Sequence, residues 1–202
     1  MRRLCKQIAE QHFSEEQRRT LLARARYAIY EVVLRGRLPD LPEVSGILAE
    51  PGAAFVSLFH KRRLRGCMGH TYRDVPLADT VVQCAITAAL HDPRFRPLCA
   101  DELAGLKIEI SVLSEFEPVL PESIKVGVHG ILATREESRG LLLPQVAVER
   151  GWSSERFLEE TCRKAGFAAN SWRNPETRIF GFTAEMFSET DLAGTIDQPI
   201  PV

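Results

Sequence analysis

The amino-acid sequence predicts an α+β fold in which helices flank a mostly antiparallel or mixed β-sheet. Helical and strand-like periodicities are interspersed along the chain, and neighbouring strands follow one another closely enough to form hairpins. The composition, 45% hydrophobic and 26% charged, is that of a chain with a packed core. A length of 202 residues suits one domain, or one domain with a smaller lobe.

In the first half of the chain the periodicity predicts two helices. The first begins at Ser14, whose side chain forms a capping box with Gln17, and carries an apolar stripe to about Gly36. The second begins at Pro76, since proline suits the start of a helix, and ends before Asp92. Half-buried or buried strands are expected over 53–59, 63–67 and 106–112.

In the second half short strands predominate. Residues 125–133 are predicted to form one strand interrupted by glycines, and 140–143 a short buried strand. A helix capped by Ser153 or Ser154 is expected to stop at Gly166. The last strand is expected to alternate at Phe180, Phe182, Ala184 and Met186. The predicted core includes Leu21, Leu22, Ile29, Val81, Ile108, Ile110, Phe157 and Phe182.

The charge balance and the cysteines exclude several classes of protein. Lys and Arg number 26 against 27 Asp and Glu, which makes nucleic acid an unlikely partner and argues against attachment to an anionic membrane. No apolar run approaches the ~20 residues that cross a bilayer, and the start lacks the apolar core of a secretory signal. Five cysteines without a CxxC pair predict no disulfide framework, no bound metal and no cofactor, and the expected compartment is the cytoplasm.

The segment Leu64-Arg65-Gly66-Cys67-Met68-Gly69 is the strongest candidate for chemistry. Gly66 and Gly69 would let a ligand approach the backbone N–H groups, and the nearby Arg65 would favour a thiolate at Cys67. The alternative is a small buried cysteine at a glycine-rich strand end. Composition alone favours that alternative, because free cysteine is among the most buried residue types.

Three other side chains are weaker candidates, each with a structural alternative. His129, beside a glycine, is either a general base or a turn residue with one satisfied hydrogen bond. Glu109 lies on the polar face of a strand and faces either a cleft or water. Arg94 either binds an anion or pairs with Asp92 to fix a proline-flanked loop, and the structural alternative is favoured.

A basic cluster at 61–65 and the Trp172-Arg173 pair offer a surface for a nucleic-acid strand, but a solvated hairpin tip is the favoured interpretation. The sequence contains no P-loop, no GxGxxG after a strand, no GxSxG and no HExxH. The common nucleotide, serine-hydrolase and metalloprotease sites are thereby excluded.

Seven separated segments, taken together, resemble the AMMECR domain family, whose microbial branch is called AmmeMemoRadiSam system protein A. They are Phe55-Val56-Ser57-Leu58, Leu64 to Gly69, Asp92-Pro93-Arg94-Phe95, Ile108 to Ser114, Val126 to Gly130, Gly140 to Ala147 and Cys162 to Gly166. Met68 stands where the family usually has Ile.

The resemblance also implies the domain organisation. Residues 1–19 form an N-terminal extension and the helix start, 20–189 the AMMECR-type domain, and 190–202 an irregular tail. It implies a larger lobe with an antiparallel sheet and flanking helices, and a smaller second lobe. The two lobes are expected to unfold as one cooperative unit.

The resemblance raises the candidacy of Cys67 without assigning an activity, and it implies a Memo-like protein and a radical SAM protein as partners. In one interpretation the chain is an enzyme, or enzyme subunit, acting on a small molecule or a modified substrate. Cys67 is then the nucleophile or redox centre, His129 the base, Arg65 the anion contact, and Glu109 or Gln145 an orienting partner.

In the other interpretation the same Arg-Gly-Cys loop serves a non-catalytic binding module, or adaptor, by presenting backbone N–H groups to a ligand or protein. The sequence leaves both open. It predicts that His129, Gln145, Glu109 and Arg65 gather around Cys67 in one concave site, because strand ends aim polar groups into common clefts.

Overall fold

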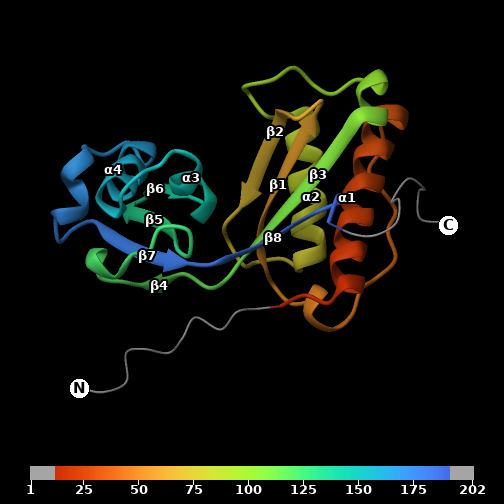
Figure 1. The fold of residues 1–202 in the computed structure, drawn as a ribbon. Coiled ribbons are helices and arrows are strands. Elements are labelled where there is room, and N and C mark those ends of the chain that lie inside the picture. Colours follow the sequence, from red (N-terminus) through yellow and green to blue (C-terminus); the bar gives the residue numbers. More distant parts are fainter. Residues whose placement is uncertain (1–11, 192–202) are drawn as a thin grey trace. The chain divides into compact units, whose positions relative to one another are not determined.

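The computed structural model describes residues 12–191 and confirms the α+β class, with antiparallel sheets and flanking helices (Figure 1). The chain divides into two compact units, which are described separately below. The larger unit consists of His12–Val112 with 185–191, and the smaller unit of Leu113–Ala184. Within the described residues, no helix has the length and apolar character that crossing a membrane requires.

The larger unit is a four-stranded sheet with two long helices. Its elements are α1 (Glu15–Arg35), η1 (Gly46–Leu48), β1 (Ala53–His60), β2 (Arg63–His70), α2 (Leu77–Leu90), η2 (Ala100–Gly105), β3 (Leu106–Leu113) and β8 (Ala184–Ser188). The strand order is β2-β1-β3-β8, so β2 forms one edge. Helix α2 packs on β1 and β2, and α1 packs on α2 (Figure 1).

Helix α1 begins and ends where the sequence predicts. The Ser14 hydroxyl accepts the Gln17 N–H, and the Gln17 side chain accepts the Ser14 N–H, which completes the capping box. Gly36 ends the helix with a φ of +63°, a left-handed conformation that glycine adopts at little cost.

The β1–β2 hairpin turns through Lys61 and Arg62, whose φ angles are +48° and +65°. Positive φ at both central residues matches the twist of a two-residue hairpin turn. Both side chains are exposed, so this part of the basic cluster is the hairpin tip that the sequence predicts.

The smaller unit has a second four-stranded sheet. Its elements are β4 (Glu117–Pro118), η3 (Pro121–Ser123), β5 (Gly130–Arg135), β6 (Ser138–Leu142), α3 (Pro144–Glu149), α4 (Ser154–Lys164), η4 (Ala169–Arg173) and β7 (Arg178–Phe182). The strand order is β4-β7-β5-β6, and α4 contacts β5 and β6.

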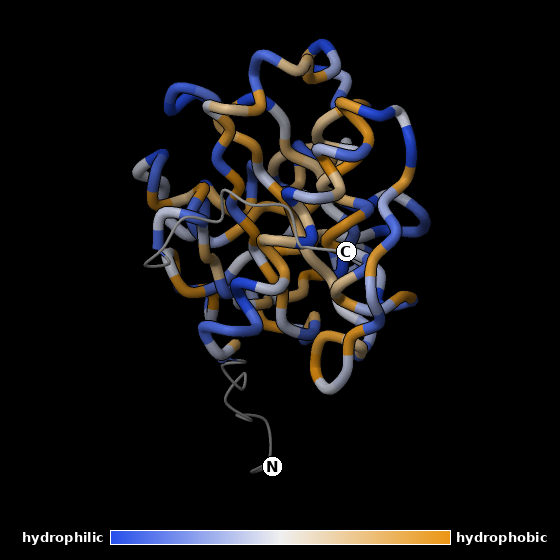
Figure 2. Tube along the Cα trace, turned by 90° about the vertical axis from the view of Figure 1, so that its right-hand side faces the viewer, coloured by the Kyte–Doolittle hydropathy of each residue, from blue (hydrophilic) through white to orange (hydrophobic). Residues whose placement is uncertain are grey.

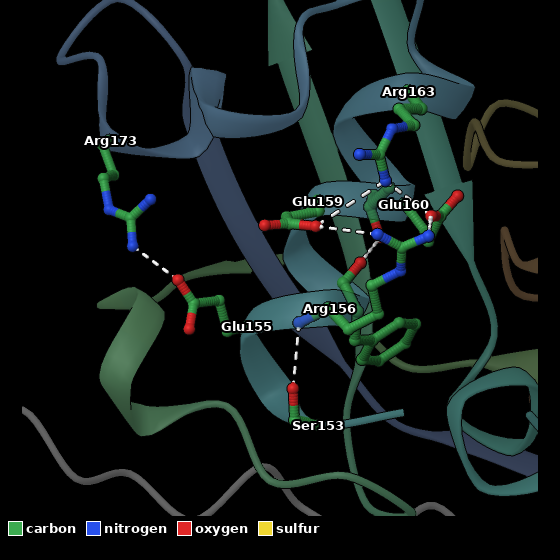
Figure 3. Close-up of polar contacts among 9 residues, drawn as sticks. Ser153, Glu155, Arg156, Glu159, Glu160, Arg163 and Arg173 are labelled. Atoms are coloured by element: carbon green, nitrogen blue, oxygen red, sulfur yellow. Dashed lines mark hydrogen bonds and ion pairs between the residues drawn. The ribbon is translucent and has the colours of Figure 1, made fainter. Parts of the chain in front are cut away.

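Helix α4 has its predicted cap and a charged outer face. Ser153 Oγ accepts the Arg156 N–H at 3.2 Å. Arg156 and Arg163 each form ion pairs with both Glu159 and Glu160, which lie one turn away along the helix (Figure 3). Since each cation has nearby carboxylates, this face presents little net positive charge.

Trp172 and Arg173, suggested as a stacking surface for a nucleic-acid strand, already contact each other. The Arg173 guanidinium lies 4.0 Å from the Trp172 ring centroid and pairs with Glu155 at 2.6 Å (Figure 3). One face of the Trp172 ring is therefore in contact with Arg173, and the charge of Arg173 is paired with Glu155 of the same unit.

Two predicted strands differ from the structure. Residues 125–129 form a turn instead of the first half of a strand, and β5 starts only at Gly130. The His129 N–H donates to the Lys125 carbonyl at 2.9 Å, and Gly127 has a φ of +83°. The glycine that was interpreted as a strand interruption therefore permits a turn.

The expected last strand is two strands that belong to different sheets. Thr183 separates β7 from β8, because its carbonyl accepts the Ser114 N–H and its own N–H donates to Ser114 Oγ. The predicted alternation is also wrong beyond this point. Met186 is 49% exposed, whereas Phe187 is buried.

The side chains expected in the core are all buried, namely Leu21, Leu22, Ile29, Val81, Ile108, Ile110, Phe157 and Phe182. The buried residues group into two clusters, one in each unit. Figure 2 shows hydrophilic residues at many outer turns and hydrophobic residues along the trace between them. Cooperative unfolding of the two units stays a prediction, and the predicted tail falls mostly outside the described residues.

Candidate functional site

Cys67 lies on the edge strand β2, paired with Ser57 of β1. An edge strand leaves its outer N–H and C=O groups without a strand neighbour, so these groups need other partners. Asp92 Oδ2 accepts the Cys67 N–H at 2.8 Å, and Arg94 Nη2 donates to the Cys67 carbonyl at 3.1 Å. The loop after α2 therefore holds both backbone polar groups of Cys67.

Asp92 and Arg94 also bind each other closely. Asp92 Oδ1 accepts the Arg94 backbone N–H at 3.0 Å and Nε at 2.9 Å, and Oδ2 accepts Nη2 at 2.7 Å. The Asp92 side chain is 1% exposed, whereas that of Arg94 is 54% exposed. The guanidinium hydrogen bonds hold the pKa of Asp92 well below its usual value, despite the opposing effect of burial.

Cys67 is a half-buried residue, and its sulfur accepts a hydrogen bond. Ser57 Oγ donates to Cys67 Sγ at 3.3 Å. The pKa of Arg94 is raised, chiefly by its side-chain hydrogen bond to Asp92. A hydroxyl at the sulfur and a guanidinium at the carbonyl of the same residue are groups that can interact with an anion bound there.

Arg65, the predicted thiolate stabiliser, is engaged elsewhere. Its Nε and Nη2 donate to Glu102 at 2.7 and 3.0 Å, and Nη2 also donates to the Pro97 carbonyl at 3.2 Å. This pair lowers the pKa of Glu102 to about 2, and both side chains are nearly buried. The described contacts therefore assign Arg65 to Glu102 and place Arg94 at the Cys67 backbone.

The glycines beside Cys67 are explained by packing in the larger unit. A Cβ on Gly66 would lie 2.2 Å from the Ala88 carbonyl oxygen, because the backbone of α2 touches β2 there. A Cβ on Gly69 would lie 2.2 Å from the ring of Phe55, its cross-strand partner. Each glycine is thus required by a close approach within the protein, whether or not a ligand binds.

Glu109 lies on the same face of the sheet as Cys67. Its neighbours on β3, Ile108 and Ile110, are buried in the core with the helices, and alternate residues of a strand point to opposite faces. Ser57 faces away from the helices for the same reason, and β1 separates β2 from β3. Glu109 and Cys67 are therefore two strands apart on one sheet face.

His129 lies in the turn before β5, in the smaller unit. Its Nδ1 accepts the Lys125 N–H at 3.2 Å, so in the neutral ring Nε2 carries the proton. Burial, and to a lesser degree the charge of Lys125, lowers the pKa of His129. A neutral ring in this tautomer is a donor at Nε2, and it could act as a base only by releasing the Lys125 N–H.

Gln145 occupies the first turn of α3, also in the smaller unit, and is half-buried. The gathering of His129 and Gln145 around Cys67 stays a prediction. Among residues 12–191, no group of three or more His, Cys, Asp or Glu side chains is arranged to hold a metal ion. His70, three residues after Cys67, pairs through Nε2 with Asp74 at 2.7 Å.

Comparison with known proteins places this site in a family. Residues 22–187 match the AMMECR1 family. The chain belongs to the AMMECR1 family. A protein of Methanothermobacter thermautotrophicus is 45% identical over 188 residues, which is 87% of this chain and 96% of that protein. A protein of Thermococcus gammatolerans is 41% identical, over 87% of this chain and 92% of its own length.

A solved structure supports the same assignment. The crystal structure of the uncharacterised protein PH0010 from Pyrococcus horikoshii is 38% identical, with a TM-score of 0.79. The similarity covers 84% of this chain and 89% of that one. The AMMECR1 assignment confirms the family resemblance drawn from the sequence.

In this AMMECR1 chain, two of the segments that carry the resemblance are joined by hydrogen bonds. Leu64 to Gly69 supplies Cys67, and Asp92-Pro93-Arg94-Phe95 supplies the carboxylate and guanidinium that hold it. The sequence predicts the Asp92–Arg94 pair but not its hydrogen bonds to Cys67. The sequence feature that could have indicated this contact is an acidic residue, Asp92, placed between the end of a helix and a proline.

Two further residues of the site were missed. Ser57 is a polar residue within the apolar strand β1, and its spacing from the buried Val56 and Leu58 could have placed it on the sheet face away from the helices. Glu102 has no comparable signal in the sequence, because its contact with Arg65 spans 37 residues and depends on how η2 folds back on β2.

Proposed function

We propose that this AMMECR1-family chain is an enzyme, or an enzyme subunit, that uses Cys67 as a nucleophile on a small-molecule or modified substrate. One observation carries the proposal: the backbone of half-buried Cys67 is held on both sides while its sulfur receives a hydrogen bond from Ser57. A reactive side chain is most effective when the surrounding structure holds it in one position.

Each contacting residue has a role in this proposal. Ser57 and Arg94 stabilise negative charge on the sulfur, and the buried Asp92 is a positioning residue that acts through the Cys67 backbone. Glu109 faces the same side of the sheet, and its proposed role is to orient a substrate. The thiolate lone pair forms the bond to an electrophilic atom, and the displaced electron pair leaves with the departing group.

Thiol reactivity tests the proposal. We expect iodoacetamide at neutral pH to label Cys67 about tenfold faster than Cys99, measured by peptide mass spectrometry. Cys99 is the matched control, because it is also partly exposed but its hydrogen bond to Glu102 raises its thiol pKa. Equal labelling rates at the two cysteines would contradict the nucleophile assignment. Cys67→Ser should abolish the fast labelling and leave the circular dichroism spectrum unchanged.

A non-catalytic binding module is the second candidate. Two observations favour it: Arg65 is paired with Glu102, and the Nδ1 of His129 already accepts a hydrogen bond, so neither is poised for the catalytic role expected from the sequence. In that case the loop around Cys67 would recognise a ligand or protein without reacting. A Cys67→Ala variant that retains ligand or partner binding would favour this candidate.

His129 and Gln145 remain proposed members of the Cys67 site. The test is a His129→Cys variant in a chain whose other cysteines, apart from Cys67, are replaced by serine. A short bifunctional thiol reagent should link positions 67 and 129 within one chain. Failure of this link, while each thiol reacts separately, would remove His129 from the proposal.

Partners and compartment are proposed on the resemblance alone. A Memo-like protein and a radical SAM protein are the proposed partners, and the cytoplasm is the proposed compartment. Co-purification of tagged chain from the native cells, with Cys67→Ser as a second bait, tests the association. Recovery of neither protein class by either bait would contradict it.

A further inference from the structure

Arg94 has hydrogen-bonding capacity that the protein leaves unused beside Cys67. Its Nε and Nη2 are directed to Asp92 and to the Cys67 carbonyl. Its Nη1 donates to no residue among the described ones, and the side chain is 54% exposed. A guanidinium carries five N–H donors, so two of them remain available to solvent or to a ligand.

The orientation of this guanidinium is set by its protein contacts. Asp92 accepts bonds from the Arg94 backbone, Nε and Nη2, and the Phe95 ring lies 5.4 Å from the guanidinium carbon. A planar fork that is already held loses little conformational freedom when it binds a ligand. Arg94 is thus a preorganised donor in a fixed place beside Cys67.

The electrostatic surroundings favour an anion at Nη1. The carboxylate that touches Arg94 is buried, and it also accepts the Cys67 N–H, so its charge is shared among several donors. Asp92 occupies the edge of the guanidinium formed by Nε and Nη2, so Nη1 lies outside the edge that this carboxylate fills. Carboxylates and phosphates are the anions that guanidinium N–H groups bind, and Nη1 has two such groups to donate.

We propose that Arg94 Nη1 binds a carboxylate or phosphate of the substrate that Cys67 attacks. This inference rests on the proposed function of Cys67 and specifies its substrate class: an electrophile that carries an anionic group close to the reacting atom. Arg94 is then a binding residue as well as part of the structure that holds Cys67 in place.

Two alkylating probes of nearly equal size test the inference. In both iodoacetate and iodoacetamide the sulfur displaces iodide, forming an S–C bond as the C–I bond breaks, but only iodoacetate is anionic. The measured quantity is the iodoacetate-to-iodoacetamide rate ratio at Cys67, relative to that of a small neutral thiol in the same solution. We expect this relative ratio to be raised roughly tenfold, since a cation near the sulfur offsets the repulsion between a thiolate and the anionic probe.

Variants identify the residue responsible. Arg94→Gln should return the ratio at Cys67 to that of the reference thiol. Arg96→Gln, which removes an exposed arginine two residues further along the same loop, should leave the ratio raised. If both variants lower the ratio equally, the effect comes from the general charge of the loop and the assignment to Arg94 is wrong.

Competition on the unaltered protein provides a test that does not depend on the Arg94 variant folding. At constant ionic strength, acetate or phosphate should slow the labelling of Cys67 by iodoacetate relative to chloride. Stronger protection by acetate indicates a carboxylate site, and stronger protection by phosphate a phosphate site. Absence of protection by both would overturn the inference.

The two proposals fail in different ways. Slow labelling of Cys67 by iodoacetamide contradicts the nucleophile function, whatever the ratio. A ratio at Cys67 equal to that of the reference thiol contradicts the anion site, even when iodoacetamide reacts fast.

Discussion

The carboxylate of Asp92 accepts the backbone N–H of Cys67 at 2.8 Å, across 25 residues of sequence. The same carboxylate holds Arg94, which reaches the Cys67 carbonyl from the other side. One buried carboxylate therefore binds the outer edge of β2 at Cys67 and also fixes the loop after α2. The effects of removing this carboxylate on protein stability and on the mobility of Cys67 can be measured separately.

Replacing Asp92 by Asn should destabilise the protein and loosen Cys67. The amide can accept fewer charge-assisted hydrogen bonds and leaves Arg94 without its counter-ion, which should reduce the free energy of unfolding by about 2–3 kcal/mol. Urea denaturation measures the loss. Asp101→Asn, an exposed acid in η2, is the control and should change little. If amide hydrogen exchange at Cys67 is unaltered in Asp92→Asn, the carboxylate does not hold this strand edge.

Alanine at Gly66 and at Gly69 should have different consequences. At position 66 the new Cβ meets the Ala88 carbonyl of α2, and only a shift of the helix relieves this contact. The expected loss is about 1–3 kcal/mol or more. At position 69 the new Cβ meets the ring of Phe55, so a second substitution, Phe55→Ala, should recover part of the loss.

Thermal unfolding of the single and double variants checks this difference. Phe55→Ala should improve Gly69→Ala but not Gly66→Ala. If Phe55→Ala rescued both glycine variants equally, the clash at position 69 would not be specific to the Phe55 ring, and the structural explanation would be wrong.

Stability should fall in acid as Glu102 becomes protonated. Its pair with Arg65 lowers the pKa of this carboxyl from 4.5 to about 2, so the folded state binds the proton less readily than the unfolded state. The stabilisation is present above pH 4.5 and is lost between pH 4.5 and 2 as the pH falls. The total is on the order of 3 kcal/mol, given the small exposure of both side chains.

Denaturant unfolding at a series of pH values measures this effect. Glu102→Gln should be less stable than the parent chain at neutral pH and should show a shallower decline over the acid range. Parallel pH profiles for the two proteins would contradict the role assigned to Glu102.

Two probes can test whether the units unfold together. Both tryptophans, Trp152 and Trp172, belong to the smaller unit, so their fluorescence reports on that unit. Cys84 belongs to the larger unit, and burial raises its thiol pKa to about 12, so it should react only when that unit opens. Coincident transitions in urea would support the single cooperative unit expected from the sequence, and separate midpoints would contradict it.

Local pattern was sufficient for most of the helices and strands. The capping box at Ser14, the stripe of α2 and the alternation around Ile108 involve residues close in sequence, and their physical causes are equally local. One failure was local, because the glycine at 127 permits a turn instead of a strand, and the other arose where a distant residue decided the conformation. Strand β7 ends before Thr183 because the Thr183 N–H donates to Oγ of Ser114, 69 residues earlier, instead of to a neighbouring strand.

The sequence by itself determined the fold class and the family, and it singled out the segment around Cys67 as a candidate site. Only the tertiary structure decided which groups surround the cysteine. Arg65 is two residues from Cys67, yet its guanidinium binds Glu102, whereas Arg94, 27 residues away, reaches the Cys67 backbone. The physical reason is that the backbone N–H and C=O groups on the outer side of an edge strand point away from the sheet. Residues of whichever loop folds against that edge then form hydrogen bonds with them.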